Sequence, residues 1–238
     1  MSYQIPGITK VSIDVEEKEP WYKRPVSSTI GRASSPLTAL ALGSQAPLGR
    51  TASGKEDFVK KLLAAAQQDK DIDKQIPLKV NFGGVHPLET LTRTWKNPRT
   101  SILTKLLGTA TQPINQALAT LSRGDHYNPF SHEVTSYTAD PAVVAHELGH
   151  AQDFSKAENP GIYTLTRMLP LSALSQEYTA SKNAIKLLRK ARMAKEISRA
   201  NRVLGGGLGS YAGSMAGVGP IPGALVGQAV GAGAEPFN

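Results

Sequence analysis

The residues best suited to do chemistry lie in one short run, residues 143–154, which reads VVAHELGHAQDF. Residues four positions apart on a helix share a face, so His146 and His150 would project together, one turn apart. Two imidazole nitrogens at this spacing suit one Zn²⁺ ion. Glu147 follows the first histidine, where it could act as general base toward water activated by the metal. The run therefore predicts a zinc site with a base beside it.

A third ligand is needed, because a catalytic zinc usually takes three protein ligands and keeps one position for water. Glu177 is the preferred candidate, since it lies in a predicted helix on a stripe of small residues, Ala173, Ala180 and Ala184. Small side chains would let this helix pack closely on the first one. The connection over residues 155–169 is long enough to reverse the chain direction. We therefore predict that Glu177 completes the metal site.

Asp153 is the alternative third ligand, because it lies three residues beyond His150 on the same helix face. A single helix seldom supplies three ligands to a tetrahedral ion, since all three would approach from one side. Asp153 is therefore expected to accept a hydrogen bond from a ligand histidine or from a partner helix. No role is assigned to His86, His126 or His132, of which His132 is the best outside candidate for a contact to the site.

The elements that must position these side chains can be read from the local sequence. Asp140 can cap exposed N–H groups and Pro141 fits a first helical position, so a helix is expected from there to about Phe154. A second helix should open at Pro170 and continue to about Arg202. The other expected elements are helices at 55–68, 87–95 and 101–121, the last interrupted near Pro113, strands at 78–82 and 133–137, and a loop at 126–130.

A known family shares the predicted site. The chain resembles the zincin metallopeptidases, and in particular their gluzincin branch, at His146, Glu147, His150, Glu177 and Ala180. The resemblance covers about residues 125–184. It implies a minimal zincin-like domain, α+β and predominantly α, in which Glu177 is the third ligand. It also implies a strand edge beside the cleft that holds a peptide, and residues 133–137 would be that edge.

The sequence departs from the family pattern at several positions near the motif. Ser181 stands where gluzincins often carry an acidic residue, which leaves open what supports a ligand histidine, and Asp153 could supply that contact. Gln152 replaces a usually apolar residue. The metzincin extension is absent, because Asp153 and Lys156 stand where its glycine and third ligand would be.

The chemistry implied by the resemblance is hydrolysis of peptide bonds. Zn²⁺ would activate water and polarise the scissile carbonyl, while Glu147 takes a proton and later delivers it to the leaving amine. Tyr163 and Tyr178 are near in sequence, and either could stabilise the developing oxyanion. The sequence does not choose between them.

Composition excludes some chemistries. The chain has 238 residues, a formal net charge of +8 and no cysteine, so disulfides and thiolate ligands are excluded. No basic motif is interleaved with aromatic residues, so no nucleic-acid partner is expected. The N-terminal residues do not resemble a secretory signal, and no stretch is apolar over about 20 residues. A cytoplasmic or membrane-associated location is therefore expected, with a virion as the alternative.

Three regions differ in composition. Residues 1–54 are rich in proline, serine and glycine and are expected to form an irregular arm. Residues 55–202 would form the catalytic domain. Residues 203–238 carry no charge before Glu235 and are expected to form a Gly-rich helical hairpin that turns at residues 219–222. Its glycines fall mostly every four residues, at Gly205, Gly209, Gly213, Gly217, Gly223, Gly227 and Gly231.

The glycine spacing and the preceding basic residues suggest a contact surface. Small residues every four positions let helices touch closely, as they often do in membranes. Basic side chains could rest on anionic headgroups; they lie at Lys182, Lys186, Arg189, Lys190, Arg192, Lys195, Arg199 and Arg202. We expect contact with a membrane or within an oligomer, and the alternative is a hairpin packed on the catalytic domain.

Two functions are consistent with the sequence. The first is a zinc-dependent metallopeptidase that acts on a peptide or protein substrate. The alternative is a structural or assembly protein, for example a virion-associated one, that retains a zincin-like zinc-binding fold. Glu147 favours the first, because a structural zinc needs no general base.

Overall fold

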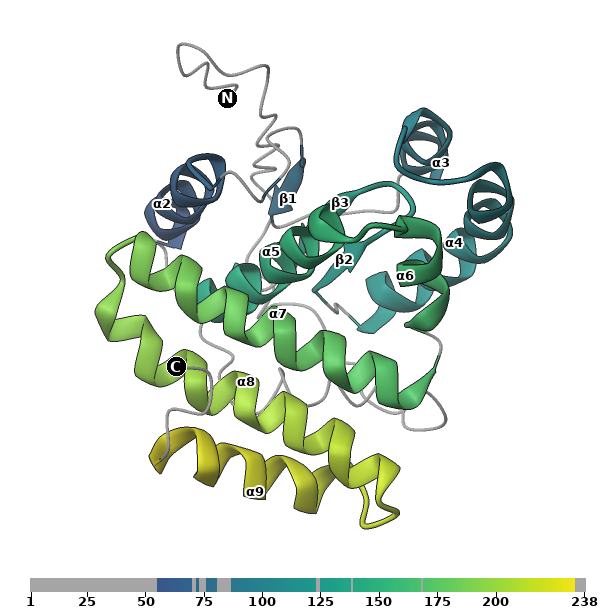
Figure 1. The fold of residues 1–238 in the computed structure, drawn as a ribbon. Helices are drawn as coiled ribbons and strands as arrows, with labels where there is room; N and C mark the ends of the chain where they lie inside the picture. Colours follow the sequence, from purple (N-terminus) through teal and green to yellow (C-terminus); the bar gives the residue numbers. More distant parts are fainter. Residues whose placement is uncertain are drawn as a thin grey trace.

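Helix α5 (Pro141–Lys156) forms the centre of the structure, and nearly all of its residues are buried. The computed structural model describes residues 55–69, 72, 76–80, 87–122, 125–137, 139–167 and 169–233 (Figure 1). Within these residues, α5 packs against the sheet, α2, α7 and α8. A helix enclosed on all sides has no polar face, which explains why the motif region is surrounded by uncharged residues. The expected arm over residues 1–54 lies outside the described residues.

The described residues form helices around a small mixed sheet, so the expected α+β, predominantly α, class is confirmed. Most helices expected from the sequence appear within one or two residues of their predicted bounds. In chain order the elements are α2 (Lys55–Gln67), β1 (Leu78–Val80), α3 (Pro87–Lys96), α4 (Ile102–Ser122), β2 (His126–Asn128), β3 (Glu133–Ser136), α5, α6 (Pro160–Thr166), α7 (Pro170–Lys190), α8 (Ala194–Met215) and α9 (Pro220–Gly233).

The start of α5 is fixed by the predicted cap. The Asp140 carboxylate accepts a hydrogen bond from the N–H of Ala142 at 2.9 Å, and Pro141 occupies the first helical turn. Arg199 of α8 also donates to the Asp140 carboxylate. One side chain therefore caps the central helix and joins it to a helix almost sixty residues later in the chain.

The sheet has the order β1-β3-β2, with β1 parallel and β2 antiparallel to β3. The expectation that residues 126–130 form a loop is wrong for 126–128, which pair with β3 so that Tyr127 faces Val134. The turn between the two strands is closed by Asn128, whose side-chain oxygen accepts from the N–H of Phe130 at 3.0 Å. The expectation that residues 133–137 form an edge strand is also wrong, because β3 is the central strand and is paired on both sides.

The expected helix from Pro170 to about Arg202 is two helices, because α7 ends at Lys190 and α8 begins at Ala194. Arg192 adopts a left-handed conformation with a φ of 56 degrees, which most residues avoid, and the N–H of Met193 donates to the carbonyl of Leu188 at 2.9 Å. Glycine is the usual residue at this kind of helix end, so the arginine at position 192 did not indicate that a helix ends here. The expected region boundary after residue 202 falls within α8.

Helix α4 continues through Pro113, so the expected interruption is wrong. A proline inside a helix removes one backbone hydrogen bond. Side chains of α3 bond to the turn of α4 that precedes Pro113. Gln112 Nε2 donates to Thr94 Oγ1 at 2.8 Å, and Trp95 Nε1 donates to Thr109 Oγ1 at 3.1 Å. These side-chain bonds help to keep α4 continuous.

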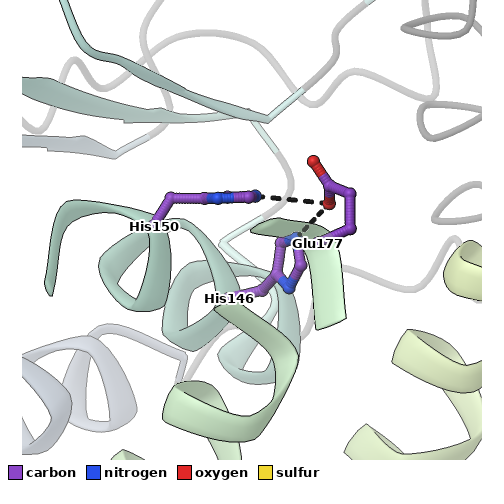
Figure 2. Close-up of side chains that lie close together, drawn as sticks. All are labelled: His146, His150 and Glu177. Atoms are coloured by element: carbon purple, nitrogen blue, oxygen red, sulfur yellow. Dashed lines mark hydrogen bonds and ion pairs between the residues drawn. The ribbon is translucent and has the colours of Figure 1, made fainter. Parts of the chain in front are cut away.

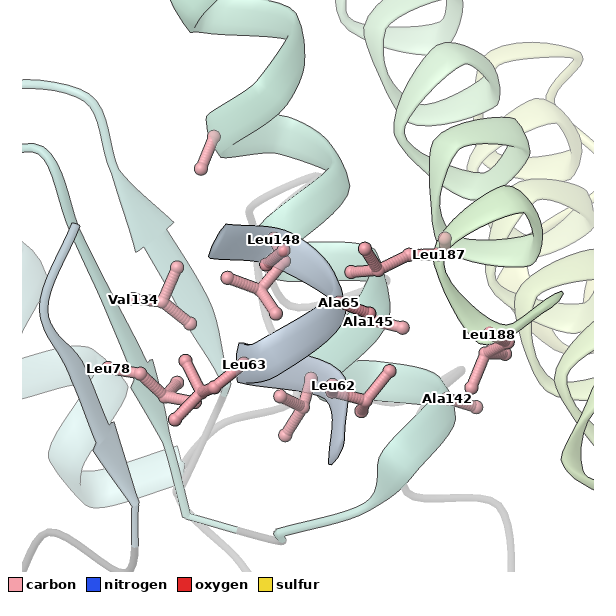
Figure 3. Packing of buried hydrophobic residues seen from close by; sticks show 14 of the residues in the cluster. Leu62, Leu63, Ala65, Leu78, Val134, Ala142, Ala145, Leu148, Leu187 and Leu188 are labelled. Atoms are coloured by element: carbon pink, nitrogen blue, oxygen red, sulfur yellow. The ribbon is translucent and has the colours of Figure 1, made fainter. Parts of the chain in front are cut away.

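The hydrophobic core lies between α2, the sheet, α5 and α7. Leucine, valine and alanine side chains from these four elements meet around α5, as Figure 3 shows. The core also receives Ala200 and Leu204 from α8. The helix that carries the histidines is therefore held by apolar packing from several directions, which restricts the movement of its side chains.

Helices α8 and α9 run antiparallel and are in close contact through glycines. A Cβ atom on Gly227 would lie 2.0 Å from the Gly205 carbonyl oxygen, and one on Gly223 would lie 2.2 Å from that of Gly209. The chain turns between them at Gly217 and Gly219, which both have positive φ. Within the described part of the chain, no helix has the length and apolar character needed to cross a membrane.

Candidate metal centre

Three buried side chains converge between α5 and α7. His146 Nε2 and His150 Nε2 lie 3.0 and 3.3 Å from the same oxygen, Oε2 of Glu177. Figure 2 shows both rings turned toward this oxygen of Glu177. Potential ligand atoms of all three residues lie within 4.8 Å of one another. The structure thus brings together the three residues that the sequence predicted as ligands, and the group could hold a metal ion.

The two separations between Glu177 and the histidines are close to those found around a small tetrahedral ion. Ligand atoms about 2.0–2.2 Å from such an ion lie roughly 3.3–3.6 Å apart. The contacts of 3.0 and 3.3 Å need only a slight opening to reach that separation. Two imidazole nitrogens and one carboxylate oxygen form a donor set that suits first-row transition metals such as zinc better than calcium or magnesium.

Close contact between α5 and α7 allows Glu177 to reach the histidines. A Cβ atom on Gly149 would lie 2.3 Å from the carbonyl oxygen of Ala180, so only glycine fits there. The Gly149 carbonyl also accepts a hydrogen bond from Asn183 Nδ2 at 3.3 Å. The missing side chain of Gly149 therefore makes room for the backbone of α7. The predicted small stripe on α7, including Ala173 and Ala180, is buried as expected.

The outer nitrogen of His146 is supported by Ser181. The Ser181 hydroxyl lies 3.2 Å from His146 Nδ1 and can accept its proton when Nε2 is used for a metal. Asp153, the alternative third ligand, accepts a hydrogen bond from the Tyr163 hydroxyl of α6 at 2.9 Å, so of its two expected donors the partner helix is confirmed and the ligand histidine is not. Ser181 itself therefore supports His146, where gluzincins often carry an acidic residue.

Arg167 is a site residue that sequence reasoning missed. Its guanidinium donates to Glu177 Oε1 at 3.3 Å and lies 3.2 Å from His150 Nδ1. Because an arginine can only donate, this Nδ1 accepts and the proton of His150 is on Nε2. Ligation through Nε2 would move that proton to Nδ1, so metal binding requires Arg167 to shift away from the ring. Nothing in the local sequence after α6 distinguishes this arginine from a solvent-exposed one.

The pKa values of Glu177, His146 and His150 are shifted in different directions. Burial opposes charge on Glu177, but the two histidines outweigh it and hold the pKa of Glu177 well below its usual value. Burial also acts to lower the pKa of His146, yet its hydrogen bond and attraction to Glu177 raise it overall. For His150 burial dominates and lowers the pKa to about 4. The site therefore keeps an ionised carboxylate ready to neutralise part of a cation's charge.

Glu147 is buried on α5 beside the first ligand. Burial, with a further contribution from the charge of Glu177, raises the pKa of Glu147 to about 8. Attraction to His146 partly offsets this effect. Glu147 is therefore a carboxyl group that exchanges a proton near neutral pH, as a general acid–base requires.

The two tyrosines that the sequence proposed for the oxyanion differ in their surroundings. Tyr163 donates its hydroxyl to Asp153, and burial raises its pKa further. Tyr178 is 42% exposed on α7. A third tyrosine, Tyr211 of α8, is buried, and burial together with the charge of Glu177 raises its pKa. Its place in the glycine-rich segment gave no sign of this influence from Glu177.

The remaining histidines stay outside the metal-binding group of the described residues. His132 Nδ1 lies 2.6 Å from the Tyr127 hydroxyl, and its ring packs against Phe154 of α5. His132 therefore supports the helix end from the turn before β3. His126 lies in β2, and His86 falls outside the described residues.

Comparison with protein-family models, with curated proteins and with solved structures finds no match for this chain. The functional interpretation therefore depends on the residues and on their geometry.

Proposed function

We propose that this protein is a zinc-dependent metallopeptidase on a minimal zincin-like domain. In this proposal His146, His150 and Glu177 hold Zn²⁺, and Glu147 is the general base. The observation that carries it is the convergence of three buried ligand atoms from two helices, with a protonatable carboxyl group on the adjacent residue. A structural zinc site would be expected to use four protein ligands and would need no such group.

The bound ion would supply Lewis-acid chemistry, making water more acidic and polarising a carbonyl group. Glu147 would accept a proton from the attacking water and return it to the leaving amine. A nearby dication would lower the pKa of Glu147 from the value of about 8 that burial produces, leaving the carboxylate able to accept. The alternation between the two protonation states is the contribution of this residue.

Arg167 and Tyr211 have supporting roles in this proposal. Arg167 holds Oε1 of Glu177, so that Oε2 alone faces the histidines and the carboxylate would bind through one oxygen. Tyr211 is a buried tyrosine whose pKa is raised by burial and by the charge of Glu177, and we place it as a candidate oxyanion donor beside Tyr163 and Tyr178. Because β3 is paired on both sides, a peptide would need the edge offered by β1 or by β2.

The proposal is tested by measuring bound zinc and peptide cleavage on the same preparations. Glu147→Gln keeps the shape of the side chain but removes its base, so zinc should remain near one equivalent while turnover falls by about a hundredfold or more. Glu177→Ala removes a ligand, so zinc and activity should be lost together. Elemental analysis and cleavage of unstructured casein, with and without chelator, provide the measurements.

Asp153→Asn is the matched control, because Asp153 is a nearby carboxylate that contacts Tyr163 and not the histidines. It should leave zinc content unchanged. Full activity in Glu147→Gln would exclude the proposed mechanism. Zinc binding by the wild-type protein without cleavage of any peptide would instead support the alternative of a structural or assembly protein that retains the zinc-binding fold.

A further inference from the structure

Helix α9 turns its glycines toward α8 and its larger side chains outward. Gly223 and Gly231 are buried, and Cβ atoms there would clash with backbone oxygens of α8 at 2.2 and 2.1 Å. The opposite side of the helix is apolar and exposed. We call it the α9 face, and it comprises Ile221 (73% exposed), Leu225 (64%), Val226 (64%) and Val230 (48%). This is the reverse of an ordinary surface helix, which buries its large apolar side chains.

The surroundings of the α9 face are also free of charge. No Asp, Glu, Lys or Arg occurs between Val203 and Gly233, a stretch that includes all of α9 and most of α8. Val218, in the turn that leads into α9, is exposed as well. A continuous apolar surface of this kind usually marks a contact site, because water does not stabilise it.

A basic surface adjoins one end of this face. The segment from Lys186 to Arg202 holds seven basic residues and one acidic residue, Glu196. Because α8 and α9 are antiparallel, the last turn of α9 lies against this segment, and a Cβ atom on Gly231 would be 3.1 Å from the Cα of Arg202. In Figure 1 α9 lies along α8 on the side away from α7. We call the exposed cations the basic corner; they are Lys186, Arg189, Lys190, Arg192, Lys195 and Arg202.

We propose that the α9 face and the basic corner together bind the surface of an anionic lipid bilayer, with α9 lying in the plane of the interface. The 14 residues of α9 make a helix about 21 Å long, which is shorter than the roughly 30 Å hydrocarbon core. A helix that cannot span can still insert one apolar side among the lipids. Neighbouring lysines and arginines then add attraction to anionic headgroups.

A second copy of the chain fits the same surface less well. A helix side about 21 Å long and about 10 Å wide offers roughly 200 Å² in projection. A stable protein interface buries about 800 Å² on each partner. A pairing through the α9 face alone would therefore be small, and it would leave the charge of the basic corner without a role.

The test measures co-sedimentation of the full chain with vesicles of phosphatidylcholine alone and of phosphatidylcholine mixed with phosphatidylglycerol. The wild-type protein should bind the anionic vesicles preferentially. Leu225→Glu with Val226→Glu should weaken that binding about tenfold or more, because it places charge in the apolar contact. Leu103→Glu is the matched control, since Leu103 is an equally exposed apolar residue on α4, and its binding should be unchanged.

Reversing charge at the basic corner separates the two contributions. Arg192→Glu with Lys195→Glu should weaken binding to anionic vesicles and leave the weak binding to neutral vesicles as it was. Added salt should have the same effect. All of these positions are exposed, and a thermal melt followed by circular dichroism establishes that each variant is folded.

Introduced cysteines give a second readout that does not depend on loss of binding. The natural chain has no cysteine, so a fluorophore on Val226→Cys reports that position alone. Its emission should shift to shorter wavelength when anionic vesicles are added, while the same label on Leu103→Cys should not shift.

Three results would overturn the proposal. They are undiminished vesicle binding by the Leu225→Glu, Val226→Glu variant, equal binding of the wild type to neutral and anionic vesicles, and absence of binding to either. Sedimentation equilibrium tests whether a second copy of the chain binds the α9 face. A dimeric wild type together with a monomeric Leu225→Glu, Val226→Glu variant would assign this face to a second copy. None of these outcomes depends on zinc or on peptide cleavage.

Discussion

Burial gives the acidic residue of the motif an unusual property. A carboxyl group with a pKa of about 8 is largely protonated in the metal-free protein at neutral pH, and burial is the main cause. The same enclosure lowers the pKa of His150 to about 4 and keeps that ring neutral. At the scale of single residues, the metal-free centre therefore combines a neutral imidazole and a protonated Glu147 with an ionised Glu177.

The stability of the metal-free protein should depend on pH through Glu147. Its folded pKa of about 8 lies above the ordinary value of 4.5, so its contribution is fully present below pH 4.5 and is lost as pH rises through 8. Glu147→Gln resembles the protonated form and cannot lose that contribution. In urea unfolding with chelator present, the free energy of unfolding of the variant relative to the wild type should therefore rise by roughly 3–5 kcal/mol between pH 4.5 and pH 8 and above. A difference that does not change with pH would show that Glu147 is already ionised in the folded state.

At the scale of elements, the metal centre depends on how closely two helices approach. Helix α5 supplies both histidines, while α7 supplies Glu177 and the Ser181 hydroxyl beside His146. The gap between the helices is set at Gly149, where no side chain could be placed without moving the α7 backbone. Distances between ligands on different helices follow directly from this gap.

Gly149→Ala should therefore damage both stability and metal binding. The added methyl group would meet the Ala180 carbonyl oxygen at 2.3 Å, and overpacking of this kind costs about 1–3 kcal/mol. Zinc affinity should fall as well, because Glu177 moves away from the histidines. Gly233→Ala is the matched control, since a Cβ atom there has no neighbour within 4 Å and alanine favours helix. Denaturant unfolding and zinc titration of both variants provide the comparison. Equal stability of Gly149→Ala and wild type would mean that the helices can separate at no cost.

At the scale of the whole molecule, the cap of α5 and the candidate metal centre both join elements that are distant in sequence. Asp140 caps α5 and is held by Arg199 of α8, while Glu177 of α7 meets the histidines of α5. Residues of α2, the sheet, α5, α7 and α8 share the same core. A ligand that binds only the assembled site should therefore stabilise this whole unit and not one helix alone.

Zinc should raise the melting temperature of the protein. A site filled at a hundred times its dissociation constant adds about 2.7 kcal/mol of stability, which corresponds to roughly 5–10 °C for a domain of this size. Differential scanning calorimetry with zinc and with chelator measures the shift. Glu177→Ala should show no such shift, and magnesium should not replace zinc in the wild type because the ligands include two imidazoles. A zinc-induced shift of equal size in Glu177→Ala would place the ion elsewhere.

The sequence by itself determined the parts of this protein that depend on contacts within a few residues. The cap at Asp140, the start of α7 at Pro170 and the shared face of His146 and His150 all follow from local geometry. The structure places Glu177 beside the two histidines and Asp153 against Tyr163, in keeping with the expectation that one helix seldom supplies three ligands. The motif spacing thus predicted two members of the candidate centre, and the stripe of small residues around Glu177 predicted the third.

Only the tertiary structure decided the rest, because the contacts involved join residues far apart in the chain. Arg167, which follows α6, donates to Glu177 of α7, and the charge of Glu177 acts on Tyr211 of α8; no local pattern encodes either interaction. The pairing of β2 with β3, and so the loss of the expected edge on β3, depends on which strand lies on the other side. Local periodicity fixes which side chains share a face, whereas the pairing of faces is settled by the burial and hydrogen bonding of the whole chain.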